Sequence, residues 1–224
     1  MSDTHTPVTP KLRPPKLRTL NLSNLAQAEP DDIDNDTTLE ALRWADTSFE
    51  DRPLRGVSFV GCELDNVALG EADLTAARFG DTRLTRINVP VLKAPDASWV
   101  GTELAASRIG AWDGYGANLR AARFVDCKVT YANLRGSTLT DVLFTGCTFD
   151  ELDLMDVKGA RAAFVDCTIG VLTAHRMQIK DLDLRGASVG AVSGMDGLKG
   201  AHLSETQVAL LSSQFAHHLG VIVH

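Results

Sequence analysis

A five-residue period dominates the sequence between residues 49 and 189. Stepping by five through this stretch meets 29 positions, of which 27 are apolar, although apolar residues make up only 44% of the chain. The two exceptions are Gly114 and Gly159. An α-helix repeats its face every 3.6 residues and a β-strand every two, so neither element by itself explains a strict period of five.

A second position, two residues before the first, favours small side chains. Val57, Ala72, Ala117 and Cys127 are examples. Between residues 47 and 191 the chain has 35 charged residues, and only Arg52 falls on either of the two positions. Two residues in every five are therefore predicted to face inward and three to face solvent.

This pattern requires the chain to turn once in every repeat. A short extended segment followed by a tight turn returns one large and one small side chain to a central axis, and stacked turns of this kind bury a continuous core. Glycine stands two residues after the large position at Gly56, Gly136 and Gly186. Such glycines suit a turn that needs permissive backbone angles.

Several repeats also carry a family signature. Residues 72–76 read Ala-Asp-Leu-Thr-Ala and residues 117–121 read Ala-Asn-Leu-Arg-Ala. They resemble the A(D/N)LXX motif of the pentapeptide-repeat family, and the resemblance extends over about residues 47–190. The N-terminal extension and the predicted C-terminal helical cap also resemble actinobacterial members of this family. The resemblance implies four repeats, hence 20 residues, per coil. The predicted fold is an all-β solenoid, a right-handed quadrilateral parallel β-helix of about seven coils and roughly 35 Å, with a C-terminal capping α-helix.

A 20-residue coil predicts that residues 20 apart stack on one another. Phe124, Phe144 and Phe164 then form one column, and Cys127, Cys147 and Cys167 another. Side chains in a parallel ladder point the same way, whereas a disulfide needs its two Cβ atoms directed toward each other. We interpret the cysteines as small, reduced core residues, with a redox or metal-binding role as the less favoured alternative.

The chain divides into three predicted segments. Residues 1–37 form a disordered or loosely ordered extension, residues 38–203 the β-helix, and residues 204–224 a capping helix and tail. Residues 1–15 hold four of the eight prolines, which favours disorder. The leucines of residues 17–25 could add a capping strand. The basic residues Lys11, Arg13, Lys16 and Arg18 are read as a solvated tail rather than as a site for an acidic partner.

The C-terminal segment has the features of an amphipathic helix. Ser204 to Gln207 has the spacing of a capping box, so a helix is predicted to begin there, and Gly220 suits its end. An open solenoid end needs a cap. The predicted face that covers the last coil, or joins two copies in a homodimer as the family resemblance implies, comprises Val208, Leu211, Phe215 and Leu219.

Net charge and patterning limit the classes of partner. The formal net charge is −7, and residues 47–200 hold 20 acidic and 17 basic residues. Direct binding to nucleic acid through a basic surface is therefore not expected. The N-terminal residues lack a basic start followed by an apolar run, and no stretch approaches the length of a membrane span, so we expect a cytoplasmic protein.

No catalytic motif is found in the sequence. HExxH, CxxC, GxSxG and a phosphate-binding loop are all absent, so no catalytic, cofactor-binding or metal-binding residue is assigned. The most irregular segment, residues 88–116, holds two prolines and a glycine-rich run, and could form a loop. Trp112, Asp113 and Tyr115 within it are candidate partner contacts. The competing interpretation places Trp112 inward, where it fills the space left by Gly114.

Two functional hypotheses follow. The first is a non-enzymatic interaction scaffold for an unidentified protein partner, which is typical of solenoids. The alternative, implied by the family resemblance, is a DNA mimic that binds DNA gyrase and inhibits the enzyme or protects it from quinolones. A duplex mimic needs closely spaced negative charge along a rod. One predicted outward column reads Asp81, Gly101, Ala121, Asp141, Arg161 and Asp181, which is not continuously acidic.

Overall fold

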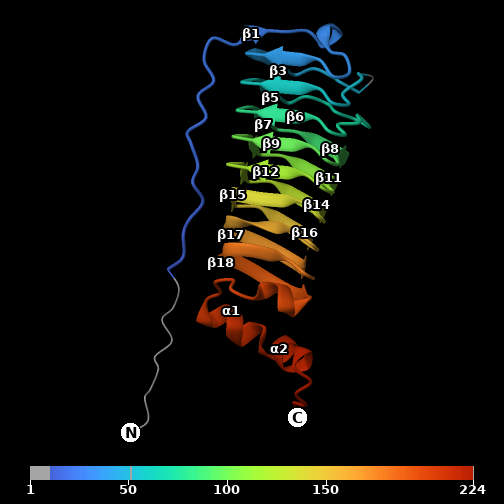
Figure 1. The fold of residues 1–224 in the computed structure, drawn as a ribbon. Helices are drawn as coiled ribbons and strands as arrows, with labels where there is room; N and C mark the ends of the chain where they lie inside the picture. The colour runs from blue at the N-terminus through green and yellow to red at the C-terminus, as the bar shows by residue number, and fades with distance from the viewer. Residues whose placement is uncertain (1–10, 51, 224) are drawn as a thin grey trace.

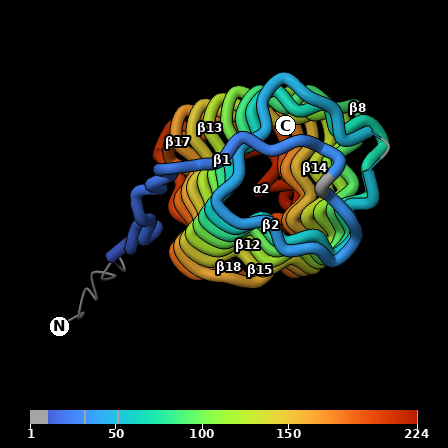
Figure 2. The backbone as a smooth tube through the Cα atoms, turned by 90° about the horizontal axis from the view of Figure 1, so that it is seen from above, coloured from blue at the N-terminus to red at the C-terminus, as the bar shows by residue number. Residues whose placement is uncertain are grey.

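A computed structural model describes residues 11–50 and 52–223 (Figure 1). Part of the N-terminal stretch that was expected to be disordered, residues 1–10, lies outside these ranges. Within the described residues, 18 strands pair in parallel in one continuous sheet that winds into a solenoid. Seen along the axis, the coils superimpose around a central core (Figure 2). The predicted fold class is confirmed.

The strands grow longer toward the C-terminus, where β17 and β18 run through 16 residues each. The bounds in the first half are β1 Ala26–Gln27, β2 Thr38–Glu40, β3 Leu42–Ala45, β4 Ser58–Val60, β5 Glu63–Asp65, β6 Arg78–Gly80, β7 Arg83–Thr85, β8 Asn88–Lys93 and β9 Ser98–Val100. Those in the second half are β10 Glu103–Ala105, β11 Arg108–Asp113, β12 Asn118–Arg120, β13 Arg123–Val125, β14 Lys128–Asn133, β15 Thr138–Thr145, β16 Thr148–Asp153, β17 Lys158–Thr173 and β18 Gln178–Ser193.

The pairing register advances by 20 residues per coil. Leu39 pairs with Phe59, Phe59 with Phe79, and the series continues through Trp99, Leu119, Leu139, Gly159 and Ile179. These pairings give about eight coils rather than about seven, because the repeat already begins at Leu39, before the stretch in which the family signature is clear.

The corners of the coils explain how five residues make one side. At three corners of most coils the backbone adopts a positive φ. Glycine adopts this conformation readily, and among L-residues Asn and Asp tolerate it best. Glycine takes some of these positions, as at Gly56 and Gly136, and Asp takes others, as at Asp126 and Asp156. The predicted turn position is therefore correct at Gly56 and Gly136, where Asp serves as well as Gly in other coils. It is wrong at Gly186, which lies inside β18 without a positive φ.

The core follows the two inward positions. In the series from residue 49 to residue 189, only Gly159 and Val189 are not buried, and in the second series from residue 52 to residue 187 only Arg52 is not. Phe144 stacks between Phe124 and Phe164, with ring centroids 4.8 and 4.6 Å apart. The four cysteines are buried and free, which confirms them as core residues. Burial raises the pKa of the Cys62 thiol.

The C-terminal end is closed by short helices. A 3₁₀ turn, η2 (Met195–Leu198), precedes α1 (Glu205–Leu210) and α2 (Ser212–His218). Ser204 and Gln207 form the predicted capping box. The single predicted helix is divided at Leu211, where the Ser212 hydroxyl donates to the Ala209 carbonyl at 2.7 Å and competes with the helical hydrogen bonds.

The N-terminal end is covered by the first strand of the described residues. β1 pairs with β3, and η1 (Pro30–Asp32) follows it across the first coil. The capping strand thus lies at β1, just after residues 17–25. Residues 11–25 are extended and run along the outside of the solenoid from near its C-terminal end to β1 (Figures 1 and 2).

Candidate interaction surfaces

Residues 88–116 form regular coil rather than a protruding loop. β8, β9, β10 and β11 occupy this segment and pair in register with the coils on either side. Pro90 lies within β8 with its ring turned to solvent. The expected loop is therefore corrected, because a proline at an outward position and a glycine at an inward one are both compatible with the coil.

Trp112 is a core residue and not a surface contact. Its side chain is 1% exposed, and its ring lies 5.8 Å from that of Trp99 and 5.2 Å from that of Phe124. A Cβ atom at Gly114 would approach the Trp112 indole nitrogen to 3.1 Å. The assignment of Trp112 to a partner surface is thus corrected, because its ring fills the space that Gly114 leaves empty.

The other two candidates of this segment stay outside the core. Tyr115 is 55% exposed, and Asp113 is half-buried. Asp113 accepts a hydrogen bond of 3.2 Å from the Asn133 side-chain amide of the next coil, so its carboxylate stabilises coil stacking. Tyr115 is the remaining candidate contact in this part of the chain.

The largest exposed apolar side chains gather at the C-terminal end. Leu219 and Val208 are 75% and 47% exposed, whereas Leu211 is 2% exposed and Phe215 packs against the core. The predicted helix face is thus split between the solenoid and solvent. Sequence reasoning missed Leu210 at 72% and Ile222 at 80%, although the apolar run of residues 221–223 is visible in the sequence.

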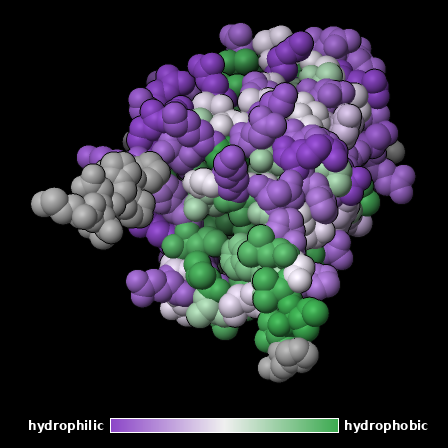
Figure 3. Space-filling model, turned by 60° about the horizontal axis from the view of Figure 1, so that its bottom comes forward, coloured by the Kyte–Doolittle hydropathy of each residue, from purple (hydrophilic) through white to green (hydrophobic). Residues whose placement is uncertain are grey.

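We call this region the C-terminal apolar surface; it comprises Val208, Leu210, Leu219, Val221, Ile222 and Val223. Figure 3 shows apolar side chains at the C-terminal end, on a molecule whose visible face is otherwise largely hydrophilic. Contiguous exposed apolar area of this kind marks interaction sites in soluble proteins. A groove of about 680 Å³ between the last coils and η2 is distinct from this surface and has Met177, Ile179 and Asp181 in its lining.

Charged side chains on adjacent coils alternate in sign. In one column, Arg43 contacts Glu63 at 3.3 Å, and Arg83 contacts Glu103 at 2.9 Å and Glu63 at 3.9 Å. At a corner, Arg176 contacts Asp156 at 2.6 Å. Hydrogen bonding from Arg176 lowers the pKa of Asp156. Such ladders place each carboxylate beside a guanidinium, so these columns carry little net charge.

The described residues contain no group of three or more His, Cys, Asp or Glu side chains that could hold a metal ion. In the same residues no helix is long and apolar enough to cross a membrane.

Comparison with known proteins gives one family and several distant structures. The model of the family described as pentapeptide repeats matches eight copies, over residues 54–88, 115–141 and 122–158. No curated protein matches the chain. The predicted resemblance to actinobacterial members stays a prediction.

Three of the similar solved structures have low sequence identity to this chain and low TM-scores. Full-length QnrB1, described as a plasmid-mediated fluoroquinolone resistance protein, is 15% identical and matches 80% of this chain and 99% of its own, with a TM-score of 0.31. A trypsin-treated variant of QnrB1 is 18% identical, with 88% and 96% covered and a TM-score of 0.32. HetL, described as a pentapeptide-repeat protein involved in heterocyst differentiation regulation from the cyanobacterium Nostoc sp. strain PCC 7120, is 15% identical, with 76% and 91% covered and a TM-score of 0.26.

Proposed function

Because this chain is a pentapeptide-repeat protein, we propose that it is a non-enzymatic scaffold that binds a protein partner through the outside of its solenoid. The observation that carries this proposal is the C-terminal apolar surface, where Leu210, Leu219 and Ile222 are each at least 72% exposed. The interior is filled by stacked side chains, so the outer faces and the ends are what the molecule offers to a partner.

We propose a second copy of the chain as one occupant of the C-terminal apolar surface. The surface lies at one end of the rod, on α1 and on the residues after α2, so two rods can meet end to end through the same patch. Self-complementary patches of this kind give closed two-fold dimers. Residues 219–223 are apolar apart from Gly220, which suits a buried interface better than a solvated tail.

Light scattering after size-exclusion chromatography tests the dimer. The wild-type chain is expected to have twice the monomer mass of 24.1 kDa, and the double variant Leu210→Asp/Ile222→Asp is expected to be monomeric. Thr206→Asp adds the same kind of charge at an exposed polar position of α1 and should remain dimeric. A monomeric wild-type chain at tens of micromolar would remove the dimer from the proposal.

Gyrase binding by DNA mimicry is the alternative function. It demands continuous negative charge, and the ladder of Arg43, Glu63, Arg83 and Glu103 instead alternates in sign. The more acidic stretch of exposed Asp31, Asp34 and Asp36 lies at the N-terminal end of the rod and covers only a small part of its length. These features favour the scaffold.

A gyrase supercoiling assay separates the two functions. Purified gyrase is run with and without the protein, beside a quinolone-protection assay. The scaffold proposal predicts unchanged supercoiling and unchanged quinolone sensitivity at micromolar protein. Inhibition or protection would establish the gyrase alternative. Whichever result is obtained, affinity capture with the Tyr115→Ala and Leu210→Asp variants would map the surface that contacts the partner.

A further inference from the structure

Residues 11–25 are rich in leucine and in basic residues, unlike a flexible polar linker. They contain five leucines and four basic residues and no acidic residue. In the structure all five leucines are half-buried, whereas Lys11, Arg13, Lys16 and Arg18 are exposed at the residue level. The leucines of the segment are therefore partly shielded from water, while its basic residues stay accessible along the surface.

The segment follows a single corner of the solenoid. Ala26, directly after it, donates a backbone hydrogen bond to Ala41 in the first coil, and Arg13 at its other end contacts Asp181 in a late coil. These two partners belong to one corner column, which we call the strap corner. Its members are Ala41, Gly61, Asp81, Gly101, Ala121, Asp141, Arg161 and Asp181, and all have positive φ.

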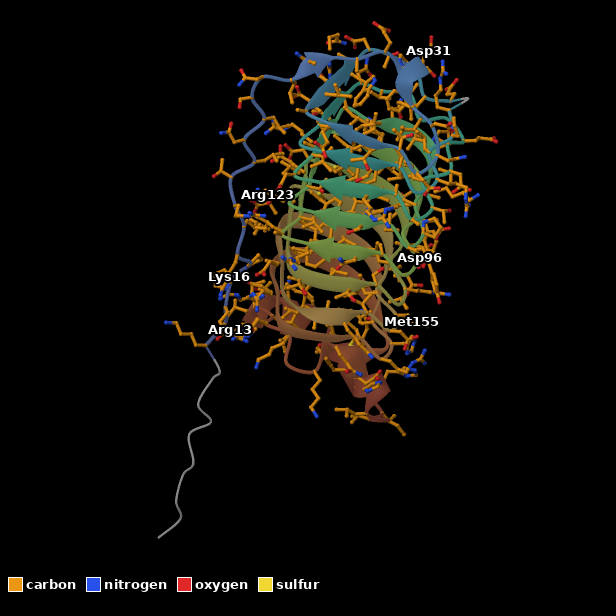
Figure 4. The ribbon with its side chains drawn as sticks, turned by 45° about the horizontal axis from the view of Figure 1, so that its top comes forward. Arg13, Lys16, Asp31, Asp96, Arg123 and Met155 are labelled. Atoms are coloured by element: carbon orange, nitrogen blue, oxygen red, sulfur yellow. The ribbon has the colours of Figure 1, made fainter. Side chains whose placement is uncertain are left out.

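Two arginine side chains and one backbone N–H of the segment meet the aspartates of the strap corner in antiparallel order. The Arg13 Nε atom donates to Asp181 at 2.9 Å, and the backbone N–H of Lys16 donates to Asp141 at 2.8 Å. Arg18 lies 3.8 Å from Asp81. Arg13 and Lys16 are labelled in Figure 4, where the segment passes beside the solenoid.

Asp141 and Asp181 are largely shielded from solvent. The side chains of Asp181 and Asp141 are 10% and 13% exposed. Hydrogen bonding from Arg13 lowers the pKa of Asp181, and hydrogen bonding from Arg161 and then from the Lys16 N–H lowers the pKa of Asp141. Both carboxylates are thus arranged to receive donors from a passing chain.

The segment is nevertheless held loosely. Residues 11–25 make no backbone-to-backbone hydrogen bond with the coils, and β1 begins only at Ala26. Arg18 and Asp81 are 77% and 62% exposed, so this ion pair is screened by solvent. Arg18–Asn21 and Asp81 line an open pocket of about 230 Å³. Ordering an extended segment costs conformational entropy, and these few contacts offset little of it. The segment therefore stays bound mainly because its covalent tether keeps it at a high effective concentration.

We propose that the strap corner is a binding site for a basic, extended, leucine-bearing peptide, which the chain's own residues 11–25 occupy in cis. A partner protein with such a segment displaces them. The contacts that select the partner are the carboxylates of Asp81, Asp141 and Asp181, which receive donors from the peptide. This site is separate from the C-terminal apolar surface, so it stands whether or not the chain dimerises or binds gyrase.

The test uses the full-length chain and a fluorescent peptide with the sequence of residues 11–25, and measures binding by fluorescence anisotropy. The variant Arg13→Glu/Leu17→Asp releases the tethered segment. It should bind the peptide at least tenfold more tightly than the wild-type chain, because a tethered competitor at high effective concentration has been removed. Arg108→Glu makes a matched charge change away from the strap corner and should behave like the wild type.

Adding Asp181→Lys to the release variant should weaken peptide binding at least tenfold. Thermal melts of each variant check that the solenoid is intact, which the peripheral position of residues 11–25 favours. Equal affinity of the wild-type chain and the release variant would overturn the proposal, as would equal binding of a scrambled peptide of the same composition.

A homotypic exchange of segments would also overturn the cis arrangement. It would appear as a dimer that the Arg13→Glu/Leu17→Asp variant loses and the Leu210→Asp/Ile222→Asp variant keeps. Binding that fails to weaken between 0.05 and 0.5 M salt, on the order of a threefold change in Debye length, would contradict recognition by the aspartates.

Discussion

Corner residues determine how tightly the chain can turn at each repeat. Positive φ recurs every five residues at three corners, at Gly, Asp, Asn, Ala and Arg alike. Some corner glycines are favoured for a second reason, because an Asp side chain of the preceding coil occupies the space that a Cβ atom would take. A Cβ atom at Gly101 would collide with the Asp81 carboxylate, and one at Gly146 with the Asp126 carboxylate.

Two glycine substitutions separate backbone conformation from steric collision. Gly61→Ala keeps open space around the new methyl group and changes only the preference for positive φ, at a cost of about 1 kcal/mol. Gly159→Ala would place its Cβ atom against the Leu139 carbonyl oxygen, and should cost at least ~2 kcal/mol. Urea unfolding of the two variants measures the difference, and equal costs would contradict the close contact between these coils.

The last coil is closed by two glutamines of the helical cap. The Gln207 side-chain amide donates to the carbonyls of Leu184 and Ala187, both at 2.5 Å. Gln214 accepts from the Val192 N–H at 2.9 Å and donates to the Gly190 carbonyl at 3.2 Å. Backbone groups that would otherwise be unpaired at an open sheet end are thus satisfied by side chains.

Gln207→Ala should destabilise the protein more than Gln214→Ala. Gln207 is 7% exposed and serves two carbonyls as well as the capping box, so its loss should cost about 2 kcal/mol. Gln214 is more accessible to water, which can replace its bonds at lower cost. Thermal unfolding of both variants, with Thr206→Ala as control, provides the measurement. A larger loss for Gln214→Ala would invalidate this account of the cap.

Across the whole molecule, ion pairs between adjacent coils and between residues 11–25 and the coils make stability depend on pH. The pKa values of Asp141, Asp156 and Asp181 are lowered, first of all by hydrogen bonds from Arg161, Arg176 and Arg13. An unfolded aspartate titrates near pH 4. Between that value and the lower folded pKa the unfolded chain binds more protons, so these groups stabilise the fold above about pH 4 and cease to do so as the pH falls.

The melting temperature should therefore be level from pH 7 to about 5 and fall steeply below about pH 4. Arg161→Gln removes the first partner of Asp141, so its melting temperature should fall less between pH 5 and pH 3 than that of the wild type. Circular dichroism melts at each pH provide the data. A melting temperature that rises on acidification would reverse the assigned direction of the pKa shifts.

The sequence by itself determined the solenoid, the inward positions and the start of the cap helix. These features repeat or are local: every apolar residue at the five-residue spacing is evidence for the same coil, and Ser204 and Gln207 are close enough in the chain to define their own capping box. Phe144 could be placed in the core because its environment repeats that of Phe124 one coil earlier.

Tertiary structure decided the features that depend on contacts between columns. The sequence left Trp112 with an inward and an outward interpretation, and the structure supports the inward one, because the Trp112 ring occupies the space beside Gly114. The path of residues 11–25 was decided in the same way, since Arg13 and Asp181 are 168 residues apart and nothing in the period tells which corner a terminal segment follows. Each of the three positive-φ corners holds three aspartates, so the corner sequence does not identify the path. The coiling of the whole chain brings Asp81, Asp141 and Asp181 into one column, beside which residues 11–25 lie.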